Sequence, residues 1–187
     1  GKLMASFYLQ DILKPDAIKS LQTLKKQNLK LIMLTGDNEF VAKEISSKVG
    51  IDSYHHSLSP IDKANFIDAL KTKKEIVVMA GDGVNDALAL SKSDISIAMG
   101  SGADISIATS DVIILDDSLE GLVKSFEISN KTYRLIKQNL GISLVYNAIT
   151  IPIAMAGYVI PLVAAISMSL SSLLVVGNSL RIKNDKK

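Results

Sequence analysis

The sequence predicts an α/β domain built on a parallel sheet, followed by a hairpin of two membrane-spanning helices. Short apolar runs alternate with helix-like segments as far as about residue 117, which is typical of parallel strands joined by right-handed crossovers. No charged residue occurs between residues 138 and 180, where two long apolar segments lie. We therefore divide the chain into an α/β domain (1–117), a connecting helix (118–139) and a transmembrane hairpin with a basic tail (140–187).

The α/β pattern is regular from the first residues. Segment 2–10 predicts a strand, and segment 15–28 predicts a helix with apolar residues on one face. A second unit repeats this order, with a strand over 29–34 and a helix over 39–49. Gly50 stands where a helix C-cap belongs.

The alternation continues after residue 50. A weak strand near "SYHH" precedes a helix over 59–70, which begins with a Ser-Pro pair suited to an N-cap and a first helical position. The continuous apolar run 75–80 is typical of a strand buried on both faces. Two more strands are expected over 95–99 and 112–115, separated by a helix near 103–109. In such sheets ligands bind beyond the carboxyl ends of the strands.

The apolar segments 140–160 and 162–180 each approach the roughly 20 residues that a membrane-spanning helix needs. A tight turn at Pro161 would join them. Basic residues flank the pair and the turn carries none, which places both ends in the cytoplasm: Lys131, Arg134 and Lys137 before it, Arg181 and Lys183 after it. We expect an integral, multi-pass protein of a bacterial plasma membrane. The alternative is a pair of buried core helices in a larger soluble protein.

Composition excludes several classes of function. The formal net charge is only +2, with no block of like charge beyond a short basic tail, so a nucleic-acid partner is not expected. The chain has no cysteine, so neither a disulfide nor a thiolate metal site can be built from this chain alone. His55 and His56 are neighbours that would point to opposite faces of a strand, so we expect them to be structural or exposed.

Two polar motifs follow predicted strands directly. In "GDGVND" (81–86), Asp82 and Asp86 offer hard oxygen ligands of the kind that bind Mg²⁺ together with phosphate oxygens. In "TGD" (35–37), Thr35 offers a hydroxyl to a phosphoryl oxygen, and Asp37 adds a second acid. Lys63 lies in the first turn of a predicted helix and could supply the fixed positive charge that phosphoryl transfer requires. Taken singly, each motif could equally be a turn or a solvated lysine.

The order of hydroxyl, lysine and paired acids resembles the haloacid dehalogenase-like phosphotransferase core. More narrowly, "QDILKPDA", "MLTGDN", "GDGVNDALALSKSDISIAMGSGADIS" and "SDVIIL" resemble the phosphorylation domain of P-type ATPases. This resemblance implies a Rossmann-like, incomplete phosphorylation domain with ATP as substrate and Mg²⁺ as cofactor. It implies that Asp82 and Asp86 bind Mg²⁺. It assigns these residues to the site of the aspartyl-phosphate: Thr35, Gly36, Asp37, Lys63, Asn85 and Asp86.

The family's nucleophile is the aspartate of a DKTGT motif, which does not occur between Gly1 and Lys187. Asp11 ends the first predicted strand but lacks the Lys-Thr-Gly-Thr that should follow, so we do not assign it as the nucleophile. We expect the motif upstream of Gly1, and we expect no ATPase activity from this chain alone. The alternative is a non-catalytic, membrane-tethered module that binds phosphate or Mg²⁺.

Two strings in the predicted spans, Tyr146-Asn147 and "MSLSS" (168–172), resemble the copper(I)-exporting heavy-metal subgroup. Met168 offers a soft thioether suited to Cu(I), and Ser171 and Ser172 would share its helical face. The alternatives are a pump for zinc, cadmium or another cation, or polar groups that only pack helices. The resemblance implies an ATP-driven copper exporter. It also implies as partners a nucleotide-binding domain, an actuator domain and upstream membrane helices of the same pump, together with lipid and a copper chaperone.

Overall fold

The computed structural model describes most of the chain: residues 13–51, 53–81, 84–100, 110–116, 118–158 and 160–182. The chain forms two compact units, residues 1–124 and 125–187. Several sequence predictions lie outside the described residues, namely the strand over 2–10, the helix near 103–109, Asp11 and Asp82.

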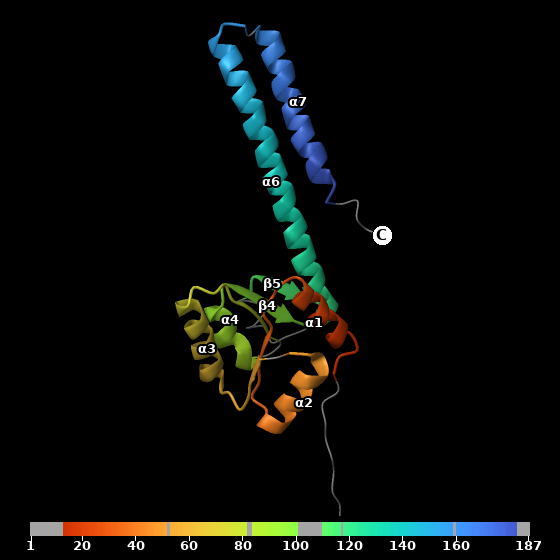
Figure 1. Ribbon diagram of the computed structural model, residues 1–187, viewed down its shortest axis with the longest axis vertical. Coiled ribbons are helices and arrows are strands. Elements are labelled where there is room, and N and C mark those ends of the chain that lie inside the picture. The colour runs from red at the N-terminus through yellow and green to blue at the C-terminus, as the bar shows by residue number, and fades with distance from the viewer. Residues whose placement is uncertain are drawn as a thin grey trace, which may run out of the picture. The chain divides into compact units, whose positions relative to one another are not determined.

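Among its described residues the first unit contains two sheets, and every pairing in them is parallel (Figure 1). One pairs β1 (Ile32–Leu34) with β2 (Ser53–His55). The other has the order β3-β4-β5, formed by β3 (Val78–Gly81), β4 (Ile95–Met99) and β5 (Val112–Ile114). The predicted α/β class with a parallel sheet is therefore confirmed.

Helices alternate with these strands, and local signals determine where they begin and end. They are α1 (Ala17–Lys26), α2 (Glu39–Val49), α3 (Pro60–Thr72), the short 3-10 helix η1 (Val84–Asp86) and α4 (Ala87–Lys92). The amide of Val41 donates to the Asn38 side chain at the start of α2, and Gly50 ends that helix with φ of 73°. The left-handed conformation at Gly50 is the one that glycine adopts without steric cost.

A small apolar cluster joins the elements that carry or flank the two polar motifs. Ile67 of α3, Val77 just before β3 and Ala89 of α4 are buried together. Leu34 of β1 and Met79 of β3 pack against the same cluster. Burial of a side chain such as Ile67 stabilises the fold by about 1.5–3 kcal/mol. The cluster therefore fixes β1, β3 and α3 relative to one another.

The second unit is a hairpin of two antiparallel helices (Figure 1). Most of α6 (Leu119–Met155) and all of α7 (Pro161–Leu180) belong to it. The α6 helix continues without a break through residue 139 and ends before Gly157, which has φ of 80°. Pro161 is the first residue of α7. The first helix therefore ends at Met155 and the second begins at Pro161, a wider separation in sequence than the tight turn that we predicted at Pro161.

The prediction of two membrane-spanning helices is not supported. Within the part of the chain that the structure describes, no helix is both long enough and apolar enough to cross a membrane. Because α6 ends at Met155, its apolar part from Leu140 is about 24 Å long, against about 30 Å for a bilayer core. The described side chains of α7 run from Ala165 to Leu180 and cover a similar length.

Candidate functional site

An ion pair between Lys63 and Asp86 lies where α3 begins and η1 ends. The Lys63 ammonium is 2.8 Å from Asp86 Oδ1, and the two side chains are only 12% and 14% exposed. Lys63 is held in the first turn of α3 by a capping box between Ser59 and Asp62, with Pro60 as the first helical residue. A charged pair that is largely removed from water is costly to break, because the remaining partner would be left without compensation.

Gly81 allows Asp86 to lie against the carboxyl end of β3. A β-carbon at residue 81 would come within 2.8 Å of both Cβ and Oδ2 of Asp86. Only a residue without a side chain therefore fits at the end of this strand. Gly81 thus allows the backbone at the end of β3 and the Asp86 carboxylate to lie in close contact.

Thr35 and Asp37 form a second pair, just beyond β1. The Thr35 hydroxyl donates to Asp37 Oδ2 at 2.7 Å and accepts a hydrogen bond from the Asp37 amide at 3.1 Å. The backbone of Thr35 is fixed on both sides, because its amide donates to the His55 carbonyl and its carbonyl accepts from the Leu58 amide, both at 3.0 Å. Asp37 is exposed and Thr35 is half-buried.

The predicted phosphate-site residues thus fall into two pairs, Thr35 with Asp37 and Lys63 with Asp86. Among the described residues, no hydrogen bond joins one pair to the other. The pairs belong to the same region of the fold, because Leu58, bonded to Thr35, directly precedes the cap of α3 that carries Lys63. Asn85 is exposed in η1.

The residues predicted to contact copper lie on the two helices of the hairpin. The Tyr146 hydroxyl is 3.1 Å from Ser167 Oγ on α7. The Ser172 hydroxyl donates to the Met168 carbonyl of its own helix at 3.1 Å, and the Met168 side chain is 68% exposed. Asn147 is exposed and Ser171 is half-buried.

Three comparisons with known proteins bear on this site. Residues 2–94 match the family model of haloacid dehalogenase-like hydrolases. The chain is 44% identical over 186 residues to a copper-exporting P-type ATPase of Staphylococcus haemolyticus, covering 100% of this chain and 23% of the relative. A crystal structure of a zinc-transporting PIB-type ATPase in the E2.Pi state matches with a TM-score of 0.86 and 33% identity, over 92% of this chain and 28% of that one.

The chain is a homologue of the P-type ATPases. It carries a haloacid dehalogenase-like hydrolase domain, as its motifs predicted. A structure of the catalytic domain of a CPx-ATPase, CopB-B, is 42% identical, with a TM-score of 0.60, over 64% of this chain and 48% of that one. This P-type ATPase homologue spans about a quarter of the length of the curated relatives that it matches.

The sequence reasoning missed two carboxylates that organise the sheet of this P-type ATPase homologue. Asp94 accepts a hydrogen bond from the Val77 amide at 2.9 Å, and Asp111 accepts from both the amide and the hydroxyl of Ser96, at 2.8 and 2.7 Å. These bonds, above all those from the backbone amides, lower the pKa of both carboxyl groups. The sequence feature that indicates both carboxylates is an aspartate just before each of two predicted strands.

The carboxylate oxygens of Asp86 are ligands of the chemical type that binds a hard cation. Asp86 uses Oδ1 to bind Lys63 and retains Oδ2, which lies against the end of β3. Carboxylate oxygens are the ligands that Mg²⁺ prefers. The described residues contain no group of three His, Cys, Asp or Glu side chains able to hold a metal, and Asp82 lies outside them.

The two histidines match the structural role expected. The His55 ring packs against the Phe66 ring with their centroids 4.3 Å apart, and His56 contacts Ser57.

Proposed function

We propose that this chain is part of an ATP-driven copper(I) export pump that couples formation and hydrolysis of an aspartyl-phosphate to ion transport. The observation that carries the proposal is the Lys63–Asp86 ion pair at the end of β3, at 2.8 Å and largely removed from water. A fixed ammonium held beside acidic oxygens is what transfer of a phosphoryl group requires, because charge must be offset on the equatorial oxygens. Relatives described as copper-exporting support the choice of ion.

In this mechanism the described residues act by position and charge. Lys63 offsets the charge of the phosphoryl group, and Asp86 holds the ammonium in place. The Thr35 hydroxyl, which now donates to Asp37, turns to donate to a phosphoryl oxygen, with Gly36 and Asp37 completing the loop. Asn85 is exposed in η1 and contacts the phosphate or its attacking water.

Asp82 and Asp86 would hold Mg²⁺, which would supply further positive charge at this site. Asp82 directly follows Gly81 in the sequence. ATP is the substrate, and the nucleophile is an aspartate of a DKTGT motif that these 187 residues do not contain. The chain alone should therefore show no ATPase activity.

The hairpin forms part of the membrane domain of the pump. Large apolar side chains are exposed along both helices, including Leu144 at 69% and Leu173 at 71%, and a surface of this kind requires an apolar partner. The match to a zinc-transporting ATPase covers 92% of the chain, so it leaves out only about 15 of the 187 residues and includes most of the hairpin.

In the complete pump, lipid and the upstream membrane helices cover the apolar surface that is exposed on this chain. Both ends of the hairpin face the cytoplasm. The nucleotide-binding and actuator domains of the pump are the other partners, and a copper chaperone delivers the ion. Cu(I) passes along the hairpin through these residues: Tyr146, Asn147, Met168, Ser171 and Ser172.

The experiment that tests the phosphate site compares two lysines of the same helix in the full-length pump. Lys63→Ala should reduce acid-stable phosphoenzyme formed from ATP by about 10²-fold or more. Lys71→Ala is the matched control, because Lys71 pairs with Asp94 at 3.0 Å and is exposed. Wild-type phosphorylation in Lys63→Ala would sink the assignment. If the full-length protein forms no phosphoenzyme at all, the non-catalytic binding module is the better account.

A second candidate ion is zinc or cadmium, favoured by the likeness to a zinc-transporting ATPase at 33% identity. Met168→Ala separates the two, because a thioether binds Cu(I) far better than Zn²⁺. Copper-stimulated ATP hydrolysis in the full-length pump should disappear in this variant if copper is the cargo. Unchanged copper stimulation, or stimulation by zinc or cadmium alone, contradicts the copper assignment.

A further inference from the structure

A layer of amide and hydroxyl side chains joins α6 and α7 near the open end of the hairpin. Asn139 Nδ2 donates to Ser179 Oγ at 2.8 Å, and Asn178 Nδ2 donates to Asn139 Oδ1 at 2.9 Å. Asn178 also contacts Gln138 at 3.3 Å. We call these four residues, Gln138, Asn139, Asn178 and Ser179, the amide layer. It fixes the register between the two helices at this level.

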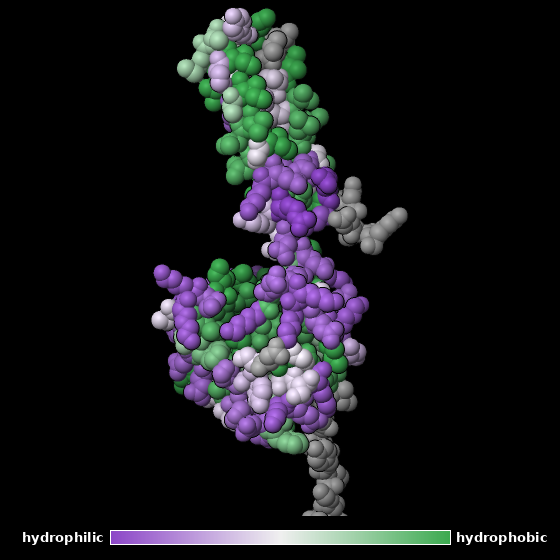
Figure 2. Space-filling model, viewed as in Figure 1, coloured by the Kyte–Doolittle hydropathy of each residue, from purple (hydrophilic) through white to green (hydrophobic). Residues whose placement is uncertain are grey.

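The amide layer divides two kinds of surface. On its tip side the helices expose large apolar side chains, beginning with Leu140 at 66% and Val176 at 57%. On its other side the face seen in Figure 2 is mainly hydrophilic, as the purple zone below the green part of the hairpin shows, although Ile136 and Leu180 are exposed there at 57% and 61%. At a boundary of this kind, a membrane protein passes from the hydrocarbon core of a bilayer into its headgroup region.

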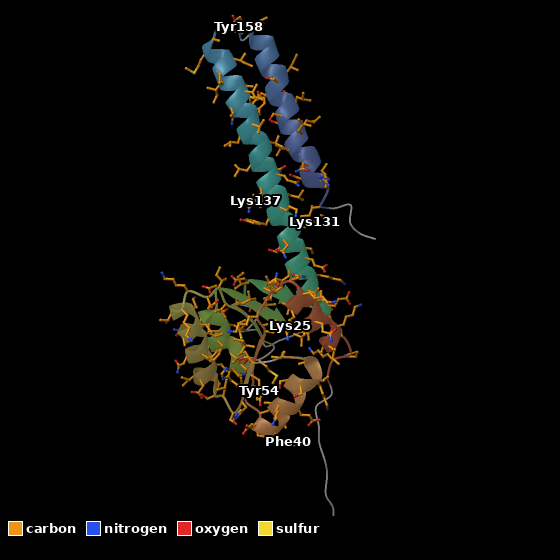
Figure 3. The ribbon with its side chains drawn as sticks, viewed as in Figure 1. Lys25, Phe40, Tyr54, Lys131, Lys137 and Tyr158 are labelled. Carbon is orange, nitrogen blue, oxygen red and sulfur yellow. The ribbon has the colours of Figure 1, made fainter. Side chains whose placement is uncertain are left out.

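Cations from both helices lie just on the hydrophilic side of the amide layer. Lys137 precedes Asn139 by two positions and Arg181 follows Asn178 by three, so they lie about 3 and 4.5 Å from the layer along the helix axes. Arg134 lies about 7.5 Å away and Lys131 about 12 Å. The labelled Lys131 and Lys137 lie along this part of α6 (Figure 3).

Asp and Glu are absent from the described part of the chain that carries Arg134, Lys137 and Arg181, since the sequence contains neither between residues 128 and 182. Arg134, Lys137 and Arg181 are exposed. The Lys137 ammonium lies 4.5 Å from the centroid of the Tyr133 ring, an aromatic residue of the type that concentrates at headgroup level. The resulting cationic band comprises Arg134, Lys137 and Arg181.

We propose that the cationic band binds the headgroups of anionic phospholipids in the leaflet at the open end of the hairpin. The proposal rests on the membrane placement given under Proposed function. The three cations closest to the amide layer fall within the depth of a headgroup region, which is about 5–8 Å on each side of a bilayer. Because the apolar part of the hairpin is short, cations that reach into the headgroups also offset the mismatch with the bilayer core. Each cation near an anionic surface strengthens binding about fivefold.

The test measures lipid selectivity of the whole chain reconstituted into phosphatidylcholine bilayers. Spin-labelled phosphatidylglycerol and spin-labelled phosphatidylcholine are added separately, and the fraction of each held at the protein surface is read from the spectra. The wild type should prefer phosphatidylglycerol, and concentrated salt should reduce the preference. The double variant Lys137→Gln with Arg181→Gln lacks two cations, so its relative affinity for phosphatidylglycerol should fall by about 25-fold. If the wild-type preference is smaller than this, the variant should retain the two lipids equally.

The matched control is Lys124→Gln, because Lys124 is a cation of the same helix that pairs with Glu120 at 3.0 Å. This variant should keep the wild-type preference. Equal retention of the two lipids by the wild type, or an unchanged preference in the double variant, overturns the inference while leaving the pump assignment intact. A chain that does not incorporate into bilayers at all overturns both this inference and the proposed membrane placement, whereas loss of phosphoenzyme formation bears only on the pump.

Discussion

Replacing Gly81 with alanine tests whether the close approach of Asp86 to the end of β3 builds the phosphate site. The new β-carbon would lie 2.8 Å from Cβ and Oδ2 of Asp86, whereas carbon atoms in contact prefer about 3.5–4.0 Å. Asp86 must therefore retreat by about 0.7 Å or more. Its Cβ is joined directly to the backbone of η1, so a change of rotamer alone cannot relieve the contact.

The displacement should have two energetic consequences. Overpacking at a buried position costs about 1–3 kcal/mol. The displacement would also disturb the Lys63–Asp86 contact, now 2.8 Å, between two poorly exposed charges that need each other for compensation. We expect Gly81→Ala to lower the free energy of unfolding by about 2 kcal/mol or more, which lowers the urea midpoint by about 1 M.

Urea unfolding of the whole chain, followed by far-UV circular dichroism in a mild detergent, measures this change. Gly36→Ala is the matched control from the other glycine-containing motif, because a β-carbon there would lie 3.5 Å from the Leu58 carbonyl oxygen, an ordinary contact. The control should unfold within about 0.5 kcal/mol of the wild type. A wild-type midpoint for Gly81→Ala, or equal losses in the two variants, would refute the reasoning.

Three further predictions concern the first unit. Ser59→Ala removes the acceptor of the Asp62 amide and should cost about 1 kcal/mol, measured as a lower urea midpoint; no change would contradict the role of the capping box. Ile67→Ala in the apolar cluster, at 2% exposure, should cost about 3 kcal/mol, and a loss below 1 kcal/mol by the same measurement would show that the cluster is not the core. The pKa of Asp111 is lowered by hydrogen bonds from the Ser96 amide and hydroxyl, so its contribution to stability is complete above about pH 4 and is lost as the pH falls through the folded-state pKa. Asp111→Asn should therefore flatten the dependence of the urea midpoint on pH below about pH 4, whereas a slope equal to that of the wild type would exclude this carboxylate as a source.

Local patterns predicted the elements well. The helix over 39–49 and its glycine cap were read from apolar spacing and a single Gly50, and both are present in the structure. The parallel arrangement followed from alternation of strands and helices alone. Membrane spans were predicted less well, because a run without charged residues does not reveal that α6 ends at Met155.

The sequence by itself determined which chemical groups follow which strands: a threonine after one, paired acids and glycines after another, and a lysine at the start of a helix. Only the tertiary structure decided which of them meet. Lys63 and Asp86 are 23 positions apart, and Asn139 and Asn178 are 39 apart. Contacts at such separations depend on how whole elements pack. A local pattern of residue types specifies an element and its exposed face, whereas the pairing of two side chains depends on where the core places both elements.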